Sequence, residues 1–88
     1  MQILRKGQAG TMQSSDLMVS VEPSDALLIE IESTVKKQFE HLIRAKLEEV
    51  LGKFGVVSGR ISVSDRGALD YAIEARLETA LQRAAGGA

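Results

Sequence analysis

The chain has 88 residues, and its 11 lysines and arginines nearly balance 12 aspartates and glutamates, which gives a formal net charge of −1. That balance offers no general attraction to nucleic acid or to a membrane surface, and the absence of cysteine excludes disulfides, cysteine-ligated zinc and a catalytic thiol. No apolar run approaches the roughly 20 residues that cross a bilayer. We therefore expect one cytoplasmic domain spanning residues 1–88, with an N-terminal arm at 1–8 and a frayed tail at 85–88, which binds neither nucleic acid nor membrane.

The first predicted element is a β-hairpin that bends at residues 13–16. In its second strand, residues 17–22, every other residue is leucine or valine, which places these apolar side chains on one face. Because such a strand has one buried face, the register of the sheet fixes the bend in space while the hydroxyls of Ser14 and Ser15 stay in water. These hydroxyls are well placed for modification by another protein. Neither is expected to be catalytic, since a serine nucleophile needs a base within hydrogen-bond reach.

Three other candidate features favour structural interpretations. Gly7 and Gly10 precede a strand instead of the helix that a phosphate-binding loop requires. His41, the only histidine, has no partner at metal-ligand spacing and is expected on the polar side of a helix. Asp65 and Asp70 lack the dense oxygen ligands of a calcium loop, so we expect them to serve the start of a helix.

The rest of the pattern predicts a third strand, a helix, a fourth strand and a second helix. Pro23 marks a four-residue turn, and alternation resumes over residues 26–32. At Ser33 and Thr34, either of which can cap a helix, the apolar period changes from 2 to 3.6. A fourth strand is expected over residues 56–64. The apolar stripes of the two helices comprise Val35, Phe39, Leu42, Ile43, Leu47, Val50, Leu51 and Phe54, and then Leu69, Ala72, Ile73, Leu77, Ala80, Leu81 and Ala84.

These elements predict a two-layer α+β domain. Each strand and helix has one apolar face, and the six elements bury those faces as a four-stranded, mainly antiparallel sheet with both helices packed on one face. The order along the chain is β-β-β-α-β-α. Gly55 is expected just past the end of the first helix, where a glycine commonly terminates a helix.

The hairpin also carries a resemblance to a known family. Residues 10–16, read Gly-Thr-Met-Gln-Ser-Ser-Asp, and the alternating strand behind them are similar to the N-terminal signature of the citrate lyase acyl carrier (gamma) subunit. Residues 35–39, 65–70 and 75–81 agree with that family at similar spacing, so the resemblance covers nearly the whole chain. Gln13 departs from it, since the family often has glutamate at this position.

The resemblance implies a covalent modification. In that family the serine that follows Gly-Thr-x-x carries a phosphoribosyl-dephospho-coenzyme A (phosphoribosyl-dephospho-CoA) group through a phosphodiester bond, and by position this serine is Ser14. A dedicated prosthetic-group transferase attaches the group, which the apo form lacks. The same resemblance makes Gly10, Thr11, Ser15 and Asp16 the supporting turn.

The resemblance also implies partners and a reaction. The thiol of the attached group holds acetyl as a thioester, and the alpha subunit of citrate lyase, an acyl transferase, exchanges acetyl for citrate. The beta subunit, a citryl-thioester lyase, then releases oxaloacetate and regenerates the acetyl carrier. The carrier is itself non-catalytic and contributes no metal site to the lyase complex.

Other functions remain open at this point. The carrier subunit of malonate decarboxylase resembles the same family and uses the same kind of prosthetic group, although the Gly-Thr-x-x-Ser tip and residues 65–70 favour the citrate enzyme. In a different class, an unmodified interaction module would use the serines only to make a turn. An independent small enzyme ranks last, because the sequence offers no base, metal set or nucleophile constellation.

Overall fold

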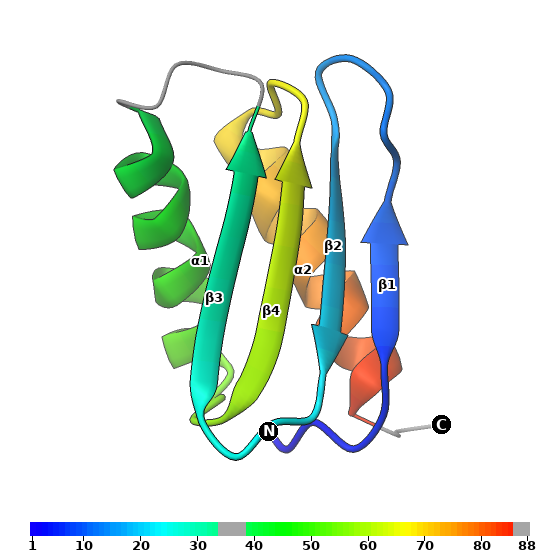
Figure 1. The fold of residues 1–88 in the computed structure, drawn as a ribbon, viewed down its shortest axis with the longest axis vertical. Helices are drawn as coiled ribbons and strands as arrows, with labels where there is room; N and C mark the ends of the chain where they lie inside the picture. Colours follow the sequence, from blue (N-terminus) through cyan, green and yellow to red (C-terminus); the bar gives the residue numbers. More distant parts are fainter. Residues whose placement is uncertain (34–38, 86–88) are drawn as a thin grey trace.

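Six elements follow one another in the order that the sequence pattern predicts. The computed structural model describes residues 1–33 and 39–85, and both helices lie on the same face of a single sheet (Figure 1). The α+β class and the packing of the helices are therefore confirmed. The elements are β1 (Gly7–Gly10), β2 (Leu17–Glu22), β3 (Leu27–Ser33), α1 (Glu40–Lys53), β4 (Gly59–Asp65) and α2 (Asp70–Ala84).

The sheet is mixed, with strand order β1-β2-β4-β3. β2 pairs antiparallel with both β1 and β4, whereas β3 and β4 run parallel. Parallel strands need a crossover connection, and α1 provides it between β3 and β4. β4 consequently lies between β2 and β3, so the segment around Pro23 does not form a tight hairpin but passes the start of β4 to reach the far edge of the sheet (Figure 1).

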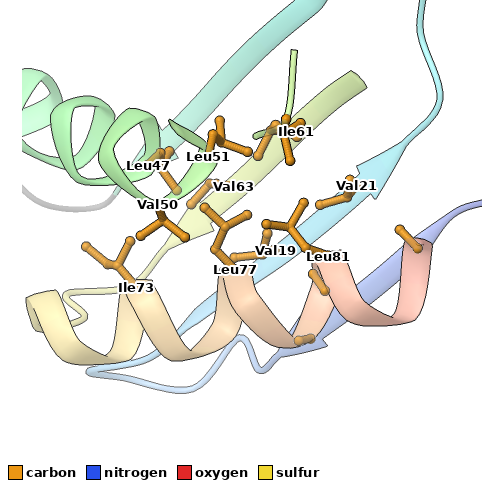
Figure 2. Close-up of a cluster of buried hydrophobic side chains, with 14 of the residues drawn as sticks. Val19, Val21, Leu47, Val50, Leu51, Ile61, Val63, Ile73, Leu77 and Leu81 are labelled. Atoms are coloured by element: carbon orange, nitrogen blue, oxygen red, sulfur yellow. The ribbon is translucent and has the colours of Figure 1, made fainter. Parts of the chain in front are cut away.

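The core lies between the sheet and the two helices. The inward face of β2 is fully buried, as its strict alternation predicts, and the inward face of β4 packs beside it. Figure 2 shows side chains from both helices meeting over these two strands. The labelled members of this cluster are Val19, Val21, Leu47, Val50, Leu51, Ile61, Val63, Ile73, Leu77 and Leu81.

Both helices begin later than the sequence pattern indicates. Ser33 is the last residue of β3 and not a helix cap, because its hydroxyl donates to the buried carboxylate of Asp65 at 2.9 Å. Thr34 and Val35 lie outside the described residues. Leu69 has an extended backbone (φ −83°, ψ 161°) before the first turn of α2, so it leaves the predicted stripe and is 61% exposed.

The apolar stripe of α1 is also shorter than predicted. Phe39 and Leu42 are exposed, and Ile43 is the first residue of this helix to reach the core. At the other end the prediction is confirmed. Gly55 has φ +66° and donates to Gly52 O at 3.1 Å, while Val56 N donates to Leu51 O at 2.9 Å, which are the two hydrogen bonds of a Schellman motif.

The N-terminal segment is hydrogen-bonded to the end of α2. Gly7 and Gln8, expected in the arm, form the first half of β1, and Ile3 is buried in the core. Leu4 N and Arg5 N both donate to Ala84 O, at 2.9 and 3.0 Å. Of the expected tail, residues 86–88 lie outside the described residues. Within the described ranges neither helix has the length and apolarity to span a bilayer.

Truncation of the core tests this architecture. Leu77 is fully buried between the sheet and α1, so Leu77→Ala is expected to lower the free energy of unfolding by about 2 to 5 kcal/mol. Urea denaturation followed by circular dichroism measures the change. Leu28→Ala, on the face of the sheet that no helix covers, is the control and is expected to cost less than about 1 kcal/mol. Equal losses in the two variants would contradict the described core.

Candidate functional site

Ser14 and Ser15 lie exposed at the turn between β1 and β2. In Figure 1 this turn is the outermost loop of the hairpin at one end of the molecule. The hairpin register pairs Gly10 with Met18, and Thr11 N extends the ladder by donating to Leu17 O at 3.0 Å. The turn is therefore a direct continuation of β2, a strand that is paired on both sides.

The two serines occupy the central positions of a four-residue turn. Asp16 N donates to Gln13 O at 3.2 Å and closes it. Ser15 has φ +64°, and among residues 1–33 and 39–85 no other non-glycine residue has a positive φ. This backbone costs a side-chain-bearing residue roughly 1 to 2 kcal/mol and persists only where surrounding contacts hold it.

The contacts that hold Ser15 come from the connection between β4 and α2. Ser15 N donates to Arg66 O at 2.8 Å, and Arg66 N donates back to Asp16 O at 2.9 Å. Two reciprocal backbone hydrogen bonds thus join the serine turn to a segment 50 positions later in the chain. Asp65 shapes that segment, since its buried carboxylate accepts from Ala68 N at 2.9 Å.

The carboxylate of Asp16 is the main polar centre of the site. Its Oδ2 accepts hydrogen bonds from Thr11 Oγ1 at 2.6 Å and from Arg76 Nη2 at 2.9 Å. Its Oδ1 accepts from Leu17 N at 2.7 Å and from Arg76 Nε at 3.2 Å. One side chain thereby connects the end of β1, the start of β2 and the middle of α2.

These donors keep Asp16 ionised. The Thr11 hydroxyl, the Arg76 guanidinium and the Leu17 N–H all favour the charged form and lower the pKa of Asp16 to about 2. The Asp16 side chain is 16% exposed and that of Arg76 is 41% exposed, so the pair is partly screened by water.

Gly10 completes the turn because no larger residue fits there. Its φ is +104°, and a Cβ at this position would lie 1.9 Å from Leu17 O. The structure thus brings Gly10, Thr11, Ser15 and Asp16 together around Ser14. Sequence reasoning missed Arg66 and Arg76, although both fall within the segments 65–70 and 75–81 that carry the family resemblance.

The remaining sequence candidates lie apart from this site. His41 is exposed in the first turn of α1, and Asp70 is exposed in the first turn of α2, where a negative charge favours the helix dipole. Asp65 does not cap α2, since it binds the Ala68 N–H ahead of the helix. In the part of the chain that the structure describes, no three histidine, aspartate or glutamate side chains gather as a metal site would require.

Comparison with known proteins finds a family model and relatives that match nearly the whole chain. The family model ACP, described as malonate decarboxylase delta subunit (MdcD), matches residues 4–84. The chain is 50% identical over 88 residues to the citrate lyase acyl carrier protein of Albidiferax ferrireducens, which covers 98% of this chain and 90% of that one. It is 48% identical over 84 residues to the protein of the same description from Haemophilus influenzae, covering 96% and 88%.

The fold also matches a solved structure. A chain of a Pseudomonas malonate decarboxylase hetero-tetramer in complex with malonate superimposes with a TM-score of 0.73 over 93% of this chain and 90% of that one. At 22% identity this likeness is one of fold.

The Asp16 contacts predict a pH-dependent stability. Because the folded state lowers the pKa of Asp16 from 3.8 to about 2, the stabilisation is complete above pH 4 and is lost as the pH falls toward 2. Asp16→Asn is therefore expected to reduce the free energy of unfolding by roughly 1 to 2 kcal/mol at pH 7, and the difference from wild type is expected to shrink below pH 4.

Urea denaturation at a series of pH values measures this difference. The control is Asp25→Asn, which removes an exposed carboxylate in the connection between β2 and β3. A deficit in Asp16→Asn that is constant from pH 7 to below pH 3 would contradict the assigned role of the charge.

Proposed function

We propose, because this chain belongs to the citrate lyase acyl carrier protein family, that it is the acyl carrier subunit of a citrate lyase and that Ser14 is its attachment residue. Membership of the family implies a non-catalytic carrier role and a covalently attached prosthetic group in general terms. The group proposed here is phosphoribosyl-dephospho-CoA. The proposed partners are the alpha and beta subunits of the lyase and the transferase that attaches the group.

The observation that carries this proposal is an exposed hydroxyl on a turn fixed from three sides. Ser14 is open to solvent, while the flanking backbone is bonded to Arg66 and the Asp16 carboxylate is bonded to Arg76. A phosphodiester bond to a primary hydroxyl requires an oxygen that a second protein can reach, and Ser14 meets this requirement. Ser15 is exposed as well, but the position after Gly-Thr-x-x in the family pattern is that of Ser14.

The attached group supplies the thiol that this cysteine-free chain lacks. The residues of the chain hold one end of the group still. Tethering makes each encounter with a partner subunit intramolecular, with an effective concentration on the order of millimolar for a short flexible arm. A braced turn serves this purpose, and no acid, base or metal is required of the carrier.

A second candidate is the carrier subunit of a malonate decarboxylase. The family description and the solved structure of similar fold both favour it. The relatives that are 43 to 50% identical are described as citrate lyase acyl carrier proteins, and this closer similarity supports the citrate enzyme.

Intact mass tests the attachment residue. On co-expression with the prosthetic-group transferase, wild type and Ser15→Gly are expected to gain the mass of phosphoribosyl-dephospho-CoA, and Ser14→Ala is expected to gain none. Ser15→Gly is the matched control, because it removes the neighbouring hydroxyl and a glycine accommodates the positive φ without strain.

Mass spectrometry of the purified proteins gives the result directly, and circular dichroism verifies that each variant is folded. A mass gain in Ser14→Ala and none in Ser15→Gly would move attachment to Ser15. No gain in any of the folded proteins would favour an unmodified interaction module.

Reconstitution separates the two carrier functions. Modified wild-type protein, loaded with acetyl and mixed with the alpha and beta subunits of a citrate lyase, is expected to support oxaloacetate formation from citrate, because its thioester is the substrate that the proposed function assigns to those subunits. An enzyme-coupled assay for oxaloacetate measures the rate. The same protein mixed with the other subunits of a malonate decarboxylase is expected to release no carbon dioxide from malonate, and the reverse pattern would assign it to the malonate enzyme.

A further inference from the structure

We propose that Arg76 is a positioning residue which, through Asp16, holds the serine turn in the one conformation that the prosthetic-group transferase accepts. The inference rests on the proposed function and adds to it the feature that the transferase recognises. That feature is a folded turn assembled from three distant segments of the chain, and not the short sequence around Ser14.

The backbone of Ser15 is strained. Its positive φ is unfavourable for a serine, so the isolated hairpin would relax to other turn conformations. The Asp16 carboxylate opposes this relaxation by bonding Thr11 before the turn and the Leu17 N–H after it. With the β1 and β2 ends of the turn tied to one carboxylate, the position of that carboxylate decides the shape of the turn.

Arg76 fixes that position. Its Nε and Nη2 reach separate oxygens of Asp16, at 3.2 and 2.9 Å, and this two-point contact sets the orientation of the carboxylate as well as its distance from α2. α2 is itself immobilised by the core, since Ile73, Leu77 and Leu81 are buried. The arginine therefore transmits the rigidity of the core to the turn.

Arg66 contributes differently to the same turn. Its backbone N–H and C=O bond Asp16 O and Ser15 N, whereas its guanidinium lies 3.5 Å from Glu32. The side chain of residue 66 is thus not needed for the turn, but the side chain of residue 76 is. Removal of the Arg76 side chain is therefore expected to loosen the turn, whereas removal of the Arg66 side chain is expected to leave it unchanged.

The same helix provides a second matched control. Arg83 also donates from α2 to the hairpin, through Nη1 to Gln8 O at 2.6 Å, but at the end of β1 that is farther from Ser14. A variant at Arg83 removes a bond of similar kind between the same two elements. It does not touch the Asp16 carboxylate.

Hydrogen exchange measures the turn without any activity assay. In apo Arg76→Gln, exchange of the Ser15 and Leu17 amides is expected to accelerate severalfold, while the amides of Val19 and Ile61 in the core exchange as in wild type. Apo Arg83→Gln and Arg66→Ala are expected to leave exchange at Ser15 and Leu17 unchanged. Unchanged exchange at these two amides in Arg76→Gln would overturn the proposal.

Steady-state kinetics of the transferase measure recognition. If the enzyme binds only the fixed turn, a lower population of that turn raises KM by the inverse of the population and leaves kcat intact. Arg76→Gln is expected to raise the KM for the carrier about 5- to 30-fold, and Arg76→Lys less, because lysine keeps the charge but loses the two-point contact. Arg83→Gln and Arg66→Ala are expected to match wild type.

The outcomes separate this inference from the proposed function. If wild type is modified and Arg76→Gln has the same KM as wild type, the inference is overturned and the proposed function stands. A fall in kcat alone in Arg76→Gln would have the same meaning. Wild type that is never modified would overturn the proposed function, and the exchange experiment would still show whether Arg76 holds the turn.

Discussion

The carboxylate of Asp16 is the point at which sheet, turn and helix are joined. Four donors surround it, two from the ends of the turn and two from Arg76, and their charge-assisted bonds are stronger than those between neutral groups. These bonds are expected to add roughly 1 to 2 kcal/mol to the stability of the domain, because the pair is partly screened by water. Their effect is local, because they offset the strain of Ser15 and give the turn one shape.

The sheet makes this local effect possible. The turn grows directly from β2, which is paired with β1 on one side and with β4 on the other, and whose inward face is completely buried. A shift of one residue in its register would exchange the buried and exposed faces, so the register cannot slip. The antiparallel pairing of β2 with β4 adds a second brace, since it sets Asp65 opposite Leu17 and so places the Arg66 backbone beside the turn.

Local patterns predicted the elements well and their arrangement only in part. The alternation in β2 and β4 and the helical stripe of α2 follow from the period of one buried face, and such signals are visible within a few residues. Strand order is not encoded in this way. Nothing around Pro23 indicates that the chain passes the start of β4, because β4 follows 36 positions later. The prediction of where α1 starts was wrong for a related reason. Ser33 is a residue type that commonly caps helices, but it is bonded to Asp65, a partner 32 positions away.

The candidate site, too, could be predicted from the sequence only in part. The turn, its two serines and its glycine can be read from the sequence, because small and polar residues between two strands favour a bend. Arg76 could not be found in this way, since it lies 60 positions from Asp16. From the local sequence, the other charged residues of α2 were equally good candidates for a partner of Asp16. Only the fold decides which of them faces the hairpin.

The serine turn lies at one end of the longest dimension of the domain, which extends 34 Å (Figure 1), and the connection between β4 and α2 braces it there. A flexible chain fastened to such a point sweeps a hemisphere that faces away from its support. The bulk of the domain never enters that volume. Under the proposed function, the enzymes that share the carrier need their entrances within the same hemisphere, and the cargo can then pass from one to the other while the carrier domain stays docked in a single orientation.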